Sequence, residues 1–213
     1  MEKKREGLLI VISGFAGTGK GTIVKRLVED YEQYALSVSM TTRAPRPGEV
    51  DGKSYFFVTK EEFEKNIAEN RLVEYASYCD NYYGTPKAYV EEMLQQGKDI
   101  ILEIEIQGAL KIRKMFPTAL LLFMMPPSAE ELKRRLVGRG TETMEVVEKR
   151  MTRAATEAAG IDQYDYIVIN DEVDACVART HSIIEAAHAK PQRNIAFIKE
   201  MQEELRQMAT SHN

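Results

Sequence analysis

Four glycines fall within eight positions of the stretch SGFAGTGKGT, residues 13–22. The stretch lies between the apolar run LLIVI, residues 8–12, and the amphipathic run IVKRLVEDY, residues 23–31. Glycine loses more conformational entropy on folding than any other residue, so this many glycines indicate a backbone that only glycine allows. An ordinary strand-to-helix turn needs fewer of them. The stretch therefore predicts a loop whose backbone wraps a ligand.

The spacing within this loop points to a phosphate ligand. Gly14, Gly19 and Lys20 match G-x-x-x-x-G-K, with a buried strand predicted before and a helix after. Successive backbone N–H groups form an anion site, and the helix adds its positive end. Lys20 can donate to the β- and γ-phosphates of a nucleoside triphosphate. We expect ATP to contact Gly14, Phe15, Ala16, Gly17, Thr18, Gly19, Lys20, Gly21 and Thr22.

Thr22 departs from the strict pattern, which places a hydroxyl directly after the lysine. Here Gly21 intervenes, and the hydroxyl comes one position later. Thr22 therefore either contacts phosphate or Mg²⁺ or only caps the helix. It is the candidate metal contact.

Short apolar runs alternate with helical patterns along the rest of the chain. The clearest strands are residues 8–13, 100–104, 119–125 and 166–169, and helices are expected at 21–31, 107–115, 128–137 and 172–187. The strands lack polar alternation, which is typical of a parallel sheet covered on both faces. The predicted fold class is α/β, a parallel sheet flanked by helices.

Two segments interrupt this alternation. Residues 38–85 mix strand-like runs with a helix near 60–68, which suggests a small inserted α/β lobe. Residues 128–158 carry two helical patterns separated by GRG at 138–140, which suggests a hinged helical lid or an ordinary loop. The core would then comprise about 1–37, 86–127 and 159–190 of a single domain, followed by a helix at about 193–209.

Composition narrows the functional classes. The 213 residues are 44% hydrophobic and 29% charged, with a net charge of −4. This balance argues against a general nucleic-acid or membrane-surface binder. The longest apolar runs are far too short to span a membrane. Cys79 and Cys176 show no ligand spacing, which suggests reduced thiols and a cytoplasmic protein.

A second informative stretch is SMTTRAPRPGEVDGKSY, residues 39–55. Arg43 and Arg46 bracket Ala44 and Pro45, and the proline restricts the chain between them. Two guanidinium forks converging on one phosphate would bind it with charge-assisted hydrogen bonds. A solvated basic loop is the other reading of this stretch.

Four motifs together resemble the guanylate kinase family: residues 39–55, VEYASYCDNYYGT, EIEIQGA and RLVGRGTET. The resemblance runs from about residue 7 to about residue 187, in the family's motif order. It implies a P-loop NTPase-type fold with an inserted GMP-binding lobe and a helical lid, and transfer of the γ-phosphoryl group of ATP to GMP with Mg²⁺. ATP and GMP are then the partners, with no nucleic acid or membrane.

The resemblance also assigns residues. It implies that the GMP phosphate is held by Arg43, Arg46, Tyr55 and Tyr83, and that guanine meets Ser39, Glu74, Thr85 and Glu105. It implies that Asn170 contacts adenine and that the transferring phosphoryl group is stabilised by Lys20, Arg43, Arg135, Arg139 and Arg150. Thr85 stands where the family has serine, and Glu105 where it has aspartate.

Glu74 and Glu105 can also be read from their chemistry. Guanine offers a ring N–H beside an amino group, and a carboxylate such as Glu74 can accept from both, whereas adenine cannot supply them. We expect Glu103 and Glu105 to lie at the carboxyl end of a strand, on opposite faces by alternation. Glu105 is assigned to guanine and Glu103 to the phosphate and Mg²⁺ side of the GMP site, and the two roles could be exchanged.

Alternatives stay open at this level. The same domain could be a non-catalytic scaffold that binds phosphopeptides, or a related small-molecule kinase acting on a phosphorylated sugar. In the C-terminal tail, Ile198, Met201, Leu205 and Met208 follow a–d heptad spacing. That helix either packs on its own core or joins two copies, so the chain is a monomer or a homodimer.

Overall fold

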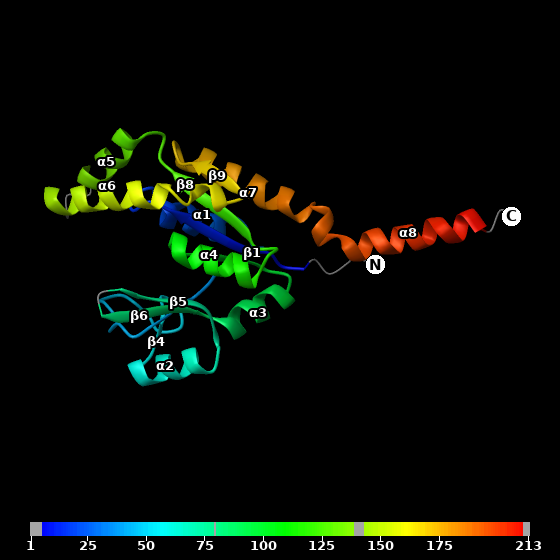
Figure 1. Cartoon of the computed structure of the whole chain (residues 1–213), viewed down its shortest axis with the longest axis horizontal. Helices are drawn as coiled ribbons and strands as arrows, with labels where there is room; N and C mark the ends of the chain where they lie inside the picture. The colour runs from blue at the N-terminus through cyan, green and yellow to red at the C-terminus, as the bar shows by residue number, and fades with distance from the viewer. Residues whose placement is uncertain (1–5, 79, 139–142, 211–213) are drawn as a thin grey trace.

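The computed structural model describes residues 6–78, 80–138 and 143–210 (Figure 1). Arg139 and Cys79, singled out above, lie outside these residues. The described helices are α1 (Lys20–Asp30), α2 (Lys60–Ala68), α3 (Lys87–Gln95), α4 (Ile106–Met115), α5 (Ala129–Gly138), α6 (Met144–Ala158), α7 (Val173–His188) and α8 (Ile195–Thr210). The described strands are β1 (Leu9–Gly14), β2 (Tyr34–Leu36), β3 (Met40–Thr41), β4 (Phe56–Phe57), β5 (Leu72–Tyr78), β6 (Asn81–Pro86), β7 (Asp99–Glu103), β8 (Leu120–Met125) and β9 (Tyr166–Ile169).

Five strands form one parallel sheet in the order β2-β7-β1-β8-β9. The four strands expected from the sequence are all in it, each within one residue of its predicted start. The short strand β2 was not predicted, because three residues give too little pattern to read. Strand β1 lies at the centre, so the glycine loop that follows it opens at the middle of the sheet's carboxyl edge. The α/β prediction is confirmed.

Helices cover both faces of this sheet, as its apolar strands require. Alternate residues of β1 point to opposite faces. Ile10 and Ile12 pack against α1 and α7, while Leu9 and Val11 pack in a second cluster with α3 and α4. These two layers explain why the strands carry no polar alternation.

A second, mixed sheet of order β4-β3-β6-β5 forms a lobe from residues within the predicted 38–85 insertion (Figure 1). Strands β5 and β6 make an antiparallel hairpin, and Asp80 takes a positive φ of 60° at its turn. Helix α2 packs Phe63 beneath the sheet against Tyr82. Helix α4 contacts β5 on one side and β1 on the other, so it joins the lobe to the core.

Helices α5 and α6 make the segment expected to be a lid. Ser128 caps the start of helix α5, because the Glu131 backbone N–H donates to Ser128 Oγ at 3.1 Å. Both helices pack apolar residues onto a third cluster that includes Phe15 of the glycine loop and Phe123 of β8. The segment is thus seated directly over the loop.

Helix α8 extends away from the rest of the molecule (Figure 1). No residue of this helix is buried, and Leu205 and Met208 are 58% and 66% exposed. The expectation that this helix packs on its own core is therefore wrong. A seam between two copies stays a prediction. Over the part of the chain that the structure describes, no helix has both the length and the apolar character needed to cross a bilayer.

Candidate active site

The glycine loop between β1 and α1 has backbone angles that favour glycine. Gly14 has φ 154° and Gly19 has φ 85°. A Cβ on Gly14 would lie 2.3 Å from the Met124 carbonyl oxygen, and one on Gly19 would lie 2.6 Å from Asn170 Nδ2. The spacing of these glycines is thus dictated by close packing against the ends of β8 and β9.

Lys20 begins α1 and folds back over the loop. Its Nζ donates to the Gly14 carbonyl at 2.6 Å and to the Phe15 carbonyl at 3.1 Å. The loop is also held from within, since Thr18 is buried and donates its hydroxyl to the Phe15 carbonyl at 2.9 Å. These bonds place the ammonium group at the mouth of the loop.

Asn170, at the end of β9, fastens the loop from outside. It is 5% exposed and donates its side-chain amide to the Thr18 carbonyl at 2.7 Å. A cavity of about 420 Å³ opens beside it, lined by Gly17, Gly19, Thr22, Arg134, Arg135, Gly138, Asn170, Asp171 and Val173. Asn170 therefore lies beside the loop as the adenine assignment requires, and it also supports the loop itself.

Arg135 of α5 reaches the same place. It donates to the Asn170 carbonyl at 2.9 Å and to Glu131 at 2.7 Å. Hydrogen bonds from Arg134 and then Arg135 lower the pKa of Glu131 to about 2, so this carboxylate stays ionised. Arg135 is thereby held over the loop, on the side away from the second sheet.

A cavity of about 350 Å³ on the other side of the loop brings several predicted residues together. Lys20, Arg150 of α6 and Glu103 of β7 all line it. Glu103 is open to this cavity but surrounded by protein. Its desolvation raises the pKa of the carboxyl, and the nearby Lys20 charge partly offsets that rise. Arg153, Glu105 and Glu157 line this cavity as well, so three cationic and three acidic side chains meet beside the loop.

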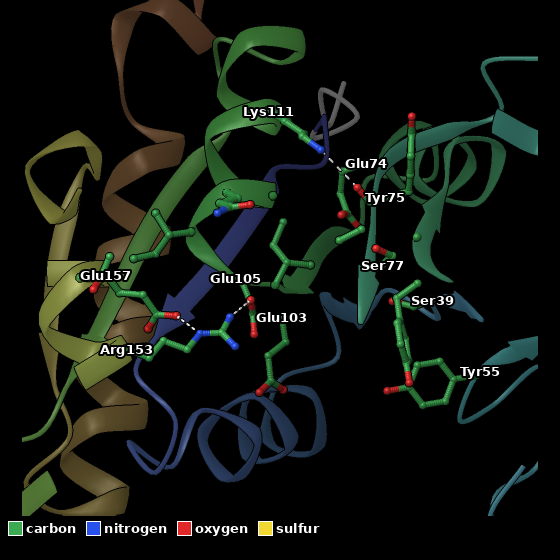
Figure 2. Close-up of a pocket in the computed structure, with 18 residues that line it drawn as sticks. Ser39, Tyr55, Glu74, Tyr75, Ser77, Glu103, Glu105, Lys111, Arg153 and Glu157 are labelled. Atoms are coloured by element: carbon green, nitrogen blue, oxygen red, sulfur yellow. Dashed lines mark hydrogen bonds and ion pairs between the residues drawn. The ribbon is translucent and has the colours of Figure 1, made fainter. Parts of the chain in front are cut away.

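A larger groove, about 620 Å³, continues from there between α4, α6 and the second sheet (Figure 2). Six residues predicted to bind GMP line it: Ser39, Tyr55, Glu74, Tyr83, Glu103 and Glu105. Glu103 lines both cavities, so the groove and the loop share one wall. The residues predicted for ATP and for GMP therefore lie on two adjoining cavities.

Glu74 forms the buried end of this groove, and Thr85 lies behind it, lining a neighbouring cavity that it shares with Ser39, Tyr55 and Glu103. Glu74 and Thr85 face each other across the β5–β6 pair, and Thr85 Oγ1 donates to Glu74 Oε1 at 2.8 Å. Glu74 is 8% exposed and Thr85 is fully buried. Burial raises the pKa of Glu74, while the Thr85 hydrogen bond and the charge of Lys111 lower it. A Cβ on Gly108 of α4 would lie 3.4 Å from Glu74 Oε2.

Glu103 and Glu105 both line the groove (Figure 2). The expectation that alternation sends them to opposite faces is wrong, because residues two apart in a strand share a face. Moreover, β7 ends at Glu103, and Glu105 is already the N-cap of α4. Glu103 Oε2 lies 3.7 Å from the position of a Cβ on Gly21, next to the loop. Glu105 instead forms an ion pair with Arg153 of α6.

The loop that carries Arg43 and Arg46, called here the arginine loop, is held in place by an acidic residue that was not predicted. Arg43 Nη2 donates to both carboxylate oxygens of Glu49, at 2.8 and 2.9 Å, and the Arg46 backbone N–H also donates to Glu49, at 2.7 Å. The Arg43 guanidinium lies over the rings of Tyr55 and Phe57, at 5.4 and 5.8 Å. Arg43 is therefore fixed behind Tyr55, whereas the Arg46 side chain is exposed.

Tyr55 and Tyr83 close this corner, with ring centroids 6.2 Å apart.

Four contributors to the site were missed from the sequence: Glu49, Gly108, Lys111 and Arg153. The acid in RAPRPGE was a usable signal for Glu49, because one carboxylate among arginines usually pairs with them. Nothing local marks Lys111 or Arg153, since each is one charged residue among many on a helix.

Comparison with known proteins gives a consistent set of similarities. The family model described as guanylate kinase matches residues 6–187. A guanylate kinase of Halalkalibacterium halodurans is 54% identical over 193 residues, covering 91% of this chain and 95% of that protein. One from Streptococcus pneumoniae is 50% identical over 196 residues, covering 92% and 94%. The crystal structure of guanylate kinase from Anaplasma phagocytophilum superposes with a TM-score of 0.71 at 33% identity, covering 90% of each chain.

Proposed function

The chain belongs to the guanylate kinase family, and we propose that it carries out its reaction in the groove between the glycine loop and the second sheet. The protein is an ATP:GMP phosphotransferase, which makes ADP and GDP. The proposed location of the reaction rests on one observation. Glu103 lines both the loop cavity with Lys20 and the groove that ends at Glu74, so donor and acceptor sites share a wall.

ATP binds along the loop, from Gly14 to Thr22. The loop amides and the N-terminus of α1 receive the phosphates, and Lys20 turns from the loop carbonyls to the β- and γ-oxygens. Adenine lies in the cavity beside Asn170. The position of Asn170 next to the loop supports this placement of adenine. Arg135 covers the phosphates from α5.

Mg²⁺ fits the oxygen atoms on the acceptor side of the loop. The Thr22 hydroxyl is exposed on the first turn of α1, and the Glu103 carboxylate lies over Gly21 of that turn. Such an ion is usually held by one or two protein oxygens together with the nucleotide phosphates. Bound with ATP, it supplies positive charge to the β- and γ-phosphate oxygens.

Guanine binds at the buried end of the groove. Glu74 accepts from its ring N–H and its amino group, and the Thr85 bond fixes the carboxylate for this purpose. Ser39 and Glu105 reach the base from the sides. A buried carboxylate without two donors would be left unpaired, which is how this site would reject adenine, by as much as about 10⁴-fold or more.

The acceptor phosphate is held at the corner formed by Arg43, Arg46, Tyr55 and Tyr83. From there it faces the γ-phosphate across the shared wall, and Lys20, Arg43, Arg135 and Arg150, with Arg139 outside the described residues, neutralise the charge that develops. No general base is required, because a phosphate monoester is itself a nucleophile. Catalysis then consists of positioning and electrostatics.

The domain organisation follows from the same proposal. Residues 38–85 form the GMP-binding lobe and 128–158 the lid, and their closure on about 1–37, 86–127 and 159–190 excludes water and limits ATP hydrolysis. The protein acts in the cytoplasm, where its nucleotide substrates are made. It is a monomer or a homodimer.

The test is ADP production from ATP with a panel of acceptors: GMP, AMP, CMP, UMP and a ribose phosphate. We expect ADP with GMP and little with the others. ADP formation with a ribose phosphate but not GMP would contradict the acceptor site. A scaffold domain would bind without turnover, and nothing in the comparisons supports that alternative.

A further inference from the structure

Arg153 of α6 stands at the junction of the two halves of the site. It lines both the loop cavity and the acceptor groove, although no motif pointed to it. It lies one turn after Arg150 on the same helix. Its side chain is 49% exposed, so it is not part of the packed core.

The guanidinium bridges two carboxylates (Figure 2). Nε donates to Glu157 Oε1 at 2.8 Å, one turn further along α6, and Nη2 donates to Glu105 Oε2. Glu157 is 20% exposed and fixes the arginine on its own helix. The other arm of the fork is thereby aimed at Glu105.

Glu105 needs such a support. It is the N-cap of α4, yet its side chain makes no capping hydrogen bond, and it is 71% exposed. Within the described residues, Arg153 is the hydrogen-bond partner of its carboxylate. An exposed glutamate held by nothing else would have to give up its rotamer freedom when it binds a ligand.

We propose that Arg153 is a positioning residue for recognition of the purine amino group, acting through Glu105. The proposal rests on the assignment of Glu105 to guanine made above. A carboxylate has two oxygens, so Oε2 can stay on Arg153 while Oε1 accepts from the 2-amino group. Fixing the carboxylate before the base arrives removes part of the ordering cost of binding.

The consequence is a selective effect on one class of purine. A 6-oxopurine with a 2-amino group gains from an oriented Glu105, and one without the amino group does not. Arg153 therefore raises the preference for GMP over IMP. A residue that merely supported the lid would affect both nucleotides alike.

The experiment compares Arg153→Ala with Lys149→Ala, which breaks an exposed ion pair with Glu145 on the same helix. Steady-state kinetics are measured with GMP and with IMP. We expect Arg153→Ala to raise KM for GMP about three- to fivefold, within the range of a partly exposed ion pair, with kcat and the IMP parameters nearly unchanged. Lys149→Ala should match the wild type, and Arg153→Lys should recover part of the loss.

A double-mutant cycle with Glu105→Ala completes the test. With Glu105 removed, Arg153→Ala should have no further effect on KM for GMP. An equal effect of Arg153→Ala with and without Glu105 would overturn the proposal, as would an equal loss with IMP. A lower KM for GMP in Arg153→Ala would also overturn it, because Arg153 would then compete with the base for Glu105. If Glu105→Ala itself leaves the GMP-to-IMP ratio unchanged, the assignment of Glu105 fails and this proposal with it. Turnover of GMP by the wild type tests the proposed site separately.

Discussion

Among single residues, the two carboxylates proposed to contact guanine have opposite surroundings. Glu74 is buried and bonded to Thr85, whereas Glu105 is exposed and paired with Arg153. Burial raises the pKa of Glu74, so the folded protein holds a proton there more tightly than the unfolded chain does. The stability that this carboxyl contributes is therefore present below its unfolded pKa and lost as the pH rises through the folded value.

Glu74→Gln should accordingly separate stability from binding. The amide cannot ionise and still accepts from Thr85, so at about pH 8 the unliganded variant should melt at a higher temperature than the wild type, with the difference shrinking as the pH falls. KM for GMP should rise roughly ten- to a hundredfold, because one of two acceptors becomes a donor. Calorimetric melting at several pH values and steady-state kinetics are the measurements. A lower melting temperature at about pH 8 would contradict the account of burial.

Lys20 gives a second prediction for a single residue. Its ammonium acts most strongly on the charge that develops during transfer, so Lys20→Ala should lower kcat about 10²- to 10³-fold. GMP affinity, measured by calorimetry without ATP, should be unchanged, since the acceptor binds on the other side of Glu103. Turnover close to that of the wild type would disprove this role.

Among the structural elements, the arginine loop is proposed to bind GMP, and the end of β9 supports the loop proposed to bind ATP. In the arginine loop, Arg46→Ala should raise KM for GMP roughly ten- to a hundredfold through loss of charge-assisted bonds to its phosphate. Arg46→Lys should not restore the wild-type value, because lysine lacks the planar fork. Guanosine, which has no phosphate, should bind poorly to the wild type. Equal calorimetric affinity for guanosine and GMP would rule out the phosphate clamp.

The end of β9 supports the glycine loop through Asn170. Asn170→Ala removes the buried bond to the Thr18 carbonyl and should destabilise the unliganded protein by about 1 to 3 kcal/mol. KM for ATP should rise while KM for GMP stays near the wild-type value. Denaturant unfolding without nucleotide distinguishes the two roles of this residue, since a contact with adenine alone would leave that stability unchanged.

At the scale of the whole molecule, helix α8 stands apart from the catalytic body. Because none of its residues is buried, a chain that ends after Asn194 should keep its kcat, and its melting temperature should lie within about 2 °C of the full chain. Sedimentation of both forms over a range of concentrations tests the heptad spacing of Ile198, Met201, Leu205 and Met208. A mass that halves on truncation would assign the helix to a dimer seam. A large loss of turnover would show that α8 supports the site.

The body itself is organised around α4, which lies between the two sheets. Gly108 of this helix approaches Glu74 of the lobe, and Glu105 at its start meets Arg153 of the lid segment. We expect movement of either the lobe or the lid segment to displace groups proposed to hold the base. This arrangement suits an enzyme that must close before transfer.

The sequence by itself determined the parallel sheet and the glycine loop. Buried strands with no polar alternation can only be covered on both faces, and Gly14 and Gly19 can only be glycine where β8 and Asn170 approach so closely. The apolar strand pattern and the G-x-x-x-x-G-K spacing can be read along the chain, although the contacts that require glycine come from residues far away in the sequence. The helix starts and the phosphate-binding motif were predictable because their signals lie in residues close together in the chain.

Only the tertiary structure decided how distant charges pair. Glu105 follows Glu103 by two residues, yet β7 ends between them, so one faces the loop and the other meets Arg153 of α6. Likewise, Thr85 reaches Glu74 only because β5 and β6 pair in one register, and the absence of buried residues in α8 is seen only in the folded molecule. Such contacts depend on where elements far apart in the chain are packed, and an exposed charge on a helix carries no local sign of its partner.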